Sequence, residues 1–138
     1  MKYDEAEAER LEAVYLGPDV VEQRKETLRC LDLKPGEHVL DIGSGPGFLC
    51  QEMADEVGAS GHVLGIDLSE DMIKRATARN SLSWVAYEHG NATDLPVSDE
   101  SFDVVVSTQV AEYVPEIESF CNEVCRVLKP GGRGLIIA

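Results

Sequence analysis

The feature that most constrains this chain is a short apolar run that passes directly into a glycine-rich turn. Residues 39–47 read Val-Leu-Asp-Ile-Gly-Ser-Gly-Pro-Gly, and a helical pattern follows them. Glycines let the backbone turn tightly and let a ligand approach without a Cβ in the way. Between a buried strand and a helix, such a turn places the ligand at the carboxyl end of the strand. We therefore expect a ligand site here, with a bare strand-to-helix turn as the alternative.

The rest of the chain alternates between helical and strand patterns, which predicts an α/β fold with a mostly parallel sheet between two helical layers. Residues 104–106 are all valine, as in a central strand that is buried on both faces. The 138 residues suffice for one domain, with N-terminal helices over 1–33 and the core over 34–138. We expect helices over 4–16, 18–31, 46–57, 70–80 and 115–128, and strands over 38–42, 62–67, 84–89, 102–107 and 134–138.

The composition argues against several classes of partner. A net charge of −14 repels phosphate backbones and anionic lipid headgroups, so we expect neither nucleic acid nor a membrane as a partner. No apolar run is long enough to span a bilayer, and the acidic first ten residues do not resemble a secretion signal. We therefore expect a cytoplasmic protein with reduced cysteines. Cys121 and Cys125 share a helix face, and we expect them to be packed rather than bound to metal.

Two further motifs follow the next two strands. Asp67 ends the second predicted strand, 20 residues after Gly47, where a carboxylate can accept hydrogen bonds from ribose hydroxyls. The alternative is a helix-capping role, which Ser69 can already fill. Residues 90–96, Gly-Asn-Ala-Thr-Asp-Leu-Pro, follow the third strand, where they can meet the edge of an adenine or form an ordinary polar loop.

The glycine spacing distinguishes between nucleotide cofactors. The dinucleotide fingerprint Gly-x-Gly-x-x-Gly, counted from Gly43, requires glycine at position 48. The chain has Phe48 there, and its glycines are at 43, 45 and 47. This spacing disfavours a nicotinamide-dependent oxidoreductase.

Together with Ser-Phe-Asp-Val-Val at 101–105 and Arg-Val-Leu-Lys-Pro-Gly-Gly at 126–132, these motifs give the chain a family resemblance over residues 15–138. It resembles class I (Rossmann-like) S-adenosylmethionine-dependent methyltransferases of the small-molecule, ubiquinone-biosynthesis-like group. The resemblance implies a sheet of order 3-2-1-4-5, S-adenosylmethionine as cofactor and S-adenosylhomocysteine as product. It also implies a small-molecule acceptor, which the motifs do not name.

The resemblance implies cofactor contacts at the positions of this sequence that match the family motifs. We assign no catalytic base. At Asn91 relatives often have aspartate, so this chain keeps the acceptor oxygen without the charge. The implied contacts are Asp41, Gly43, Ser44, Gly45 and Gly47 for the methionine part, Asp67 for the ribose, Leu68, Met72, Asn91 and Ala92 for the adenine, Gln109 near the sulfonium and the acceptor, and Tyr15 and Arg24 near the cofactor carboxylate.

Family members normally have seven strands, in the order 3-2-1-4-5-7-6, and this sequence supplies five, without strands 6 and 7. Residues 135–137 would then lie on an open sheet edge, which can pair with another chain. We expect a homodimer through this edge or through exchanged N-terminal helices. The sequence thus leaves two readings open: an active small-molecule methyltransferase, or an S-adenosylmethionine-binding module without turnover.

Overall fold

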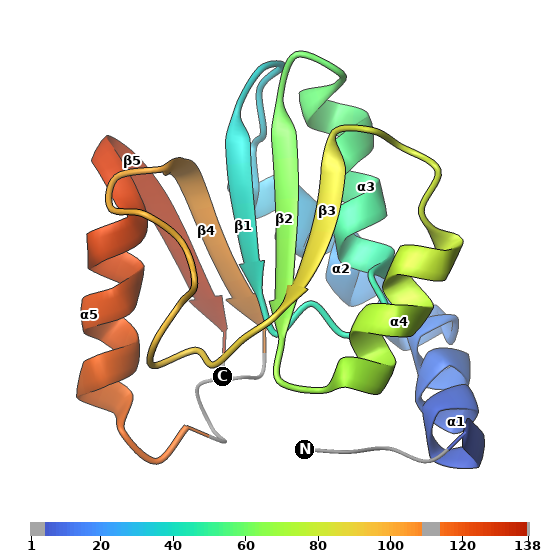
Figure 1. Cartoon of the computed structure of the whole chain (residues 1–138). Helices are drawn as coiled ribbons and strands as arrows, with labels where there is room; N and C mark the ends of the chain where they lie inside the picture. The colour runs from blue at the N-terminus through green and yellow to red at the C-terminus, as the bar shows by residue number, and fades with distance from the viewer. Residues whose placement is uncertain (1–4, 109–113, 138) are drawn as a thin grey trace.

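A five-stranded sheet in the order β3-β2-β1-β4-β5 forms the middle layer of the molecule (Figure 1). The computed structural model describes residues 5–108 and 114–137, without the side chains of residues 8 and 11. All four neighbouring strand pairs run parallel, which confirms the predicted fold class and strand order. The strands are β1 (His38–Ile42), β2 (His62–Asp67), β3 (Val85–His89), β4 (Phe102–Thr108) and β5 (Leu128–Ile137).

Helices cover both faces of the sheet (Figure 1). Ser69 caps α4 as predicted, because its hydroxyl accepts a hydrogen bond of 3.3 Å from the backbone N–H of Met72. The third helix begins at Phe48 rather than at residue 46, because Gly47 has a left-handed φ of +90°. The helices are α1 (Glu5–Tyr15), α2 (Pro18–Leu31), α3 (Phe48–Val57), α4 (Glu70–Arg79) and α5 (Ile117–Val127).

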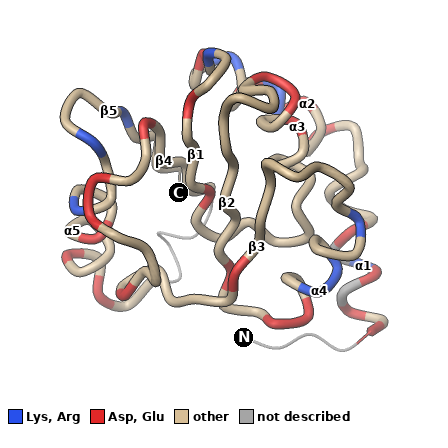
Figure 2. The backbone as a smooth tube through the Cα atoms, turned by 45° about the horizontal axis from the view of Figure 1, so that its top comes forward, with Lys and Arg blue, Asp and Glu red and all other residues tan. Residues whose placement is uncertain are grey.

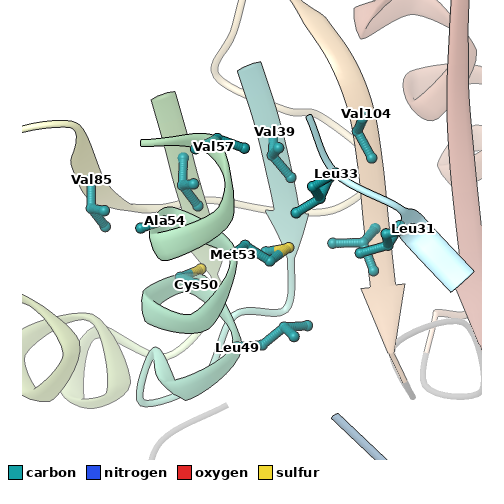
Figure 3. Close-up of a cluster of buried hydrophobic side chains, with 12 residues drawn as sticks. Leu31, Leu33, Val39, Leu49, Cys50, Met53, Ala54, Val57, Val85 and Val104 are labelled. Atoms are coloured by element: carbon teal, nitrogen blue, oxygen red, sulfur yellow. The ribbon is translucent and has the colours of Figure 1, made fainter. Parts of the chain in front are cut away.

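The strands send alternate side chains to two separate cores. Val104 and Val106 pack with residues of α3 in one core (Figure 3), whereas Val105 packs with Phe120 of α5 in the other. The three valines are therefore buried on both faces, as the sequence predicted. Both cores lie against β1, which fixes the end of this strand in the centre of the molecule.

Two predictions about the last third of the chain are wrong. The segment 129–132 does not separate α5 from the last strand, because β5 begins at Leu128 and the ladder with β4 shifts register around this segment. The extra residues form a bulge, in which Gly131 has a φ of +80°. Cys121 and Cys125 are exposed rather than packed. The buried stripe of α5 consists of Phe120, Val124 and Val127.

Among the residues that the structure describes, no helix has the length and apolarity needed to cross a bilayer. No cluster of three or more histidine, cysteine or acidic side chains within these residues could hold a metal ion.

Candidate functional site

The glycine turn lies where the strand order reverses direction. Strand β1 is flanked by β2 on one side and by β4 on the other, and ligands of open α/β sheets bind at such switch points. The backbone N–H groups of Gly43 and Ser44 both donate to the carbonyl of Ile66, at 2.7 and 3.0 Å. The turn is therefore fixed to the end of β2 as well as to β1.

Two constraints explain why the turn requires glycine: the backbone conformation and the side chains packed against the turn. Gly45 and Gly47 have φ values of +56° and +90°. A Cβ at Gly47 would lie 2.5 Å from the Tyr87 hydroxyl, and one at Gly45 would lie 3.0 Å from the Tyr15 hydroxyl. Gly65 of β2 leaves room in the same way, because its Cβ would lie 2.7 Å from the Tyr87 ring. Tyr87 thus fills the space that Gly47 and Gly65 leave free, and Tyr15 fills the space beside Gly45.

Polar contacts hold Tyr87 in that place. Its hydroxyl donates to the carbonyl of Gly47 at 3.3 Å and accepts from the amide of Gln51 at 3.0 Å. The same amide donates to Asn80 at the end of α4, also at 3.0 Å. The turn, α3, α4 and β3 are therefore connected through one tyrosine.

Asp41 is the most unusual charge at the site. It is 2 % exposed, and its Oδ2 accepts a hydrogen bond of 3.4 Å from the thiol of Cys50. Its Oδ1 is buried without a hydrogen-bond partner among the described residues. Burial, opposed by the Cys50 bond and assisted by the nearby Asp67, raises the pKa of Asp41 to about 7. A buried oxygen without a donor is unfavourable, so this carboxyl is suited to a cationic or N–H donor from a ligand.

Asp67 connects the first two motifs of the sequence. Its Oδ2 accepts from the backbone N–H of Gly45 and its Oδ1 from that of Ser69, both at 2.8 Å. The carboxylate therefore lies at the turn and at the start of α4. Each oxygen keeps a further lone pair, so both can also accept hydrogen bonds from ribose hydroxyls.

The predicted adenine contacts differ in what they offer a ligand. Leu68 is 49 % exposed beside Asp67, whereas Met72 is 1 % exposed and has almost no free surface. The side-chain oxygen of Asn91 accepts from the backbone N–H and the hydroxyl of Thr93, at 3.0 and 2.9 Å, and Ala92 is partly buried against the α5 core. Asn91 therefore orders its own loop. Gln109 lies outside the described residues.

The N-terminal helices bring Tyr15 to the turn and hold it there. The Tyr15 ring stacks on Phe48 with 5.9 Å between ring centroids, and the Arg79 guanidinium lies 4.4 Å from the same Phe48 ring. Acidic residues of α1 face the basic residues of α4 (Figure 2), where Arg79 also pairs with Glu12 at 2.9 Å. These contacts fix α1 beside the ligand site.

Arg24 of α2 binds groups from α1 and α3. It is buried, and its guanidinium donates to the carbonyl of Tyr15 at 2.5 Å and to Glu52 at 2.8 Å. Its charge therefore joins α1 and α2 to α3, and its role at the cofactor carboxylate stays a prediction.

Two supporting residues were missed by the sequence reasoning. Gly65 could have been found, because a glycine inside a strand often marks a close approach of another group. Tyr87 gave no comparable signal, since an aromatic residue in a strand is ordinary. Its position under the turn depends on the register of β3 against β2, where Tyr87 faces Gly65.

The parallel sheet of order β3-β2-β1-β4-β5, with helices on both faces and a glycine turn after β1, defines an α/β protein of the Rossmann-like class. The family described as "Methyltransferase domain" matches residues 33–138, and the chain belongs to this family. Its relatives include arsenite and demethylmenaquinone methyltransferases, and its structural neighbours include a SAM-dependent methyltransferase. These matches confirm the resemblance predicted from the motifs and imply S-adenosylmethionine as the cofactor.

Three similar proteins illustrate the relationship. The arsenite methyltransferase of Halobacterium salinarum is 45 % identical over 104 residues, which are 73 % of this chain and 27 % of the relative. A demethylmenaquinone methyltransferase of Listeria monocytogenes is 40 % identical over 116 residues, covering 82 % of this chain and 49 % of the relative. The structure of a SAM-dependent methyltransferase from Aquifex aeolicus superposes with a TM-score of 0.80 at 27 % identity, over 93 % of this chain and 69 % of that one. The chain thus spans half or less of the length of these two curated relatives.

Proposed function

We propose that the chain binds S-adenosylmethionine at the turn 43–47 and supports methyl transfer from it to a small-molecule acceptor. The observation that best supports this is the buried Asp41 carboxyl, whose Oδ1 has no hydrogen-bond partner among the described residues. The ammonium group of the cofactor's methionine part supplies the missing donor and the missing positive charge. A neutral ligand would leave the buried charge unpaired.

The other predicted contacts fit the same ligand. Asp67 would accept the ribose hydroxyls, while the turn residues Gly43, Ser44, Gly45 and Gly47 would lie against the methionine part. Leu68 offers an exposed apolar surface for an adenine face. Met72, Asn91, Ala92, Tyr15 and Gln109 stay in the proposed contact set as sequence predictions. We treat residues 1–138 as one such domain, with the helices up to residue 33 set against the core.

Methyl transfer requires the protein mainly to position the acceptor against the methyl donor. S-adenosylmethionine, when bound, supplies a methyl group already activated by its sulfonium. The chain would then hold the acceptor in line with that group and exclude water, and such positioning supplies much of the rate. An acceptor that is a weak nucleophile would also need a base, and we assign none.

The names of the relatives support an acceptor of small size. Arsenite and demethylmenaquinone, named for two of them, differ in chemistry and share only their low molecular weight. The acceptor class is therefore a small molecule, and its identity is left to assay. Pairing of two copies through β5 or the N-terminal helices and a cytoplasmic location remain predictions from the sequence.

A turnover assay separates the two readings that the sequence left open. The protein is incubated with S-adenosylmethionine and either arsenite or a demethylmenaquinol analogue, and S-adenosylhomocysteine is measured. Acceptor-dependent product supports methyl transfer. Cofactor binding without product from either acceptor supports a binding module.

The ribose role of Asp67 has its own test. Asp67→Ala removes the proposed charge-assisted hydrogen bonds and should weaken S-adenosylhomocysteine binding by about 1–3 kcal/mol, measured by calorimetry. Asp55→Ala is the control, because Asp55 is an exposed aspartate in the last turn of α3, at the end of this helix away from the glycine turn. Equal affinity of the Asp67 variant and the wild type would contradict the ribose role.

A further inference from the structure

The segment between β3 and β4, residues 90–101, is held in place largely by one turn of α5. We refer to it as the β3–β4 loop. Apart from an isolated bridge between Asn91 and Asp94, it contains no helix or strand pairing. A loop of this length needs partners for its backbone polar groups, and Glu123 and Arg126 supply them.

The Arg126 guanidinium uses all five of its N–H donors. Its Nε and Nη2 donate to the two carboxylate oxygens of Glu123, at 2.7 and 2.8 Å. The second Nη2 donor reaches the carbonyl of Leu95 at 3.1 Å. Nη1 donates to the carbonyl of Val97 and to the Asp99 carboxylate, both at 2.8 Å. A guanidinium offers five donors in a fixed plane, so this site leaves none free.

Glu123 completes the arrangement from the same turn of α5. Its Oε2 accepts from the backbone N–H of Leu95 at 2.7 Å. The pair therefore bonds both the N–H and the C=O of Leu95, whose side chain is 4 % exposed. The hydrogen bond from Arg126, opposed by partial burial, lowers the pKa of Glu123, so the carboxylate stays charged near neutral pH.

The two halves of the loop are anchored differently. Downstream of Leu95, the backbone N–H groups of Glu100 and Ser101 also donate to the end of α5, both at 2.9 Å. Upstream, Asn91 accepts hydrogen bonds from the backbone N–H and the hydroxyl of Thr93 and from the backbone N–H of Asp94, all within the loop. Leu95, directly after the Asn91–Asp94 turn, is therefore hydrogen-bonded to the helix through both its N–H and its C=O.

We propose that Glu123 and Arg126 are positioning residues for adenine recognition, acting through Leu95 on the turn that contains Asn91 and Ala92. This inference rests on the proposed function, in which that turn meets the adenine edge. Lysine cannot replace Arg126, because an ammonium has three donors and no planar fork. Neither residue needs to touch the cofactor for the effect.

The test compares two variants with a matched control. Arg126→Lys and Glu123→Gln each disturb the pair, whereas Arg29→Lys alters another arginine–glutamate pair at i,i+3, formed by Arg29 and Glu26 on the exposed face of α2. Affinity is measured by calorimetry for S-adenosylhomocysteine and for S-inosylhomocysteine, whose base lacks the exocyclic amine. We expect the preference for the adenine ligand to fall about five- to tenfold in the two variants and less than about twofold in the control.

Amide hydrogen exchange at Leu95 checks the mechanism without a ligand. We expect faster exchange in Arg126→Lys than in the wild type, at an unchanged global unfolding free energy. A wild-type protein that does not bind S-adenosylhomocysteine would overturn the proposed function and this inference together. Normal wild-type binding with an unchanged base preference in both variants would overturn the positioning role alone. If Arg126→Lys unfolds, the base preference of Glu123→Gln alone decides between these outcomes.

Discussion

The turn after β1 and the loop after β3 are both expected to touch the cofactor, yet they are built in opposite ways. The turn is supported from beneath by buried side chains, with Tyr87 filling the space that Gly47 and Gly65 leave. The β3–β4 loop is held from the side by Arg126, whose side chain is 30 % exposed, and by its partner Glu123. The first region should therefore respond to changes of volume, and the second to changes of charge.

The two regions should also respond to pH in opposite directions. Burial raises the pKa of Asp41 to about 7, so its ionisation above this pH destabilises the unliganded fold. The hydrogen bond from Arg126 lowers the pKa of Glu123, so protonation in acid weakens the loop attachment. Without a ligand, both parts should be intact only at mildly acidic pH, above the lowered pKa of Glu123 and below the pKa of about 7 of Asp41. A cationic ligand at Asp41 would extend this range to higher pH.

The largest effect is expected at Gly47. Gly47→Ala places a Cβ 2.5 Å from the Tyr87 hydroxyl at a φ of +90°. The backbone conformation should cost about 1–2 kcal/mol and the overpacking about 1–3 kcal/mol. Urea unfolding should therefore show a loss of roughly 2–5 kcal/mol.

Gly131→Ala is the matched control for this prediction. Gly131 has a similar φ of +80°, but a Cβ there meets nothing within 4 Å. Only the backbone cost of about 1–2 kcal/mol should remain. Equal losses in the two variants would contradict the role of Tyr87 under the turn.

The next effect is a pH dependence at Asp41. Its folded-state pKa of about 7 lies above the ordinary value of 3.8, so its stabilisation is present at low pH and is lost as the pH rises through 7. From pH 5 to pH 8 the unliganded wild type should lose about 2–3 kcal/mol relative to Asp41→Asn, which does not titrate. Denaturant unfolding of both proteins at the two pH values measures this loss. If the difference in unfolding free energy between the two proteins is the same at both pH values, the pKa of Asp41 is not raised.

The smallest effect concerns the loop. Because the pKa of Glu123 is lowered from 4.5, the pair contributes fully above that pH and is lost as the pH falls through the lower folded-state value. The loss should be under about 1 kcal/mol, since the pair is partly solvated. NMR of the Leu95 amide should show a titration in acid that Glu123→Gln abolishes, while the amides of the turn 43–47 do not follow it.

The same contrast explains how much could be read from the sequence. The bounds of β1 and β2 and the cap at Ser69 were predicted, because each depends on a local pattern of apolar, glycine and capping residues. The strand order was predicted from the family resemblance. The sequence placed Asp67 at the end of the second strand. The structure brings it beside Gly45 because the carboxyl ends of parallel strands share one edge. These features define the turn side of the site.

Contacts between distant elements were not predictable in the same way. The bonds of Arg126 to Leu95 and Val97 join residues about 30 positions apart, and no local pattern encodes them. The exposure of Cys121 followed from which stripe of α5 faces the sheet, since one position along a helix turns a side chain by about 100°. The β5 bulge depends on pairing with β4, so residues 129–132 read as a turn in isolation.

Calorimetric titration of the intact chain with S-adenosylhomocysteine tests the central claim most directly, with NADH titrated in parallel. We predict one site per chain for S-adenosylhomocysteine and no binding of NADH, because the glycine turn, Asp41 and Asp67 together match a nucleoside with an amino-acid tail. Absence of binding heat with S-adenosylhomocysteine across a range of temperatures, or saturable binding of NADH in its place, would contradict the assignment of this turn to S-adenosylmethionine.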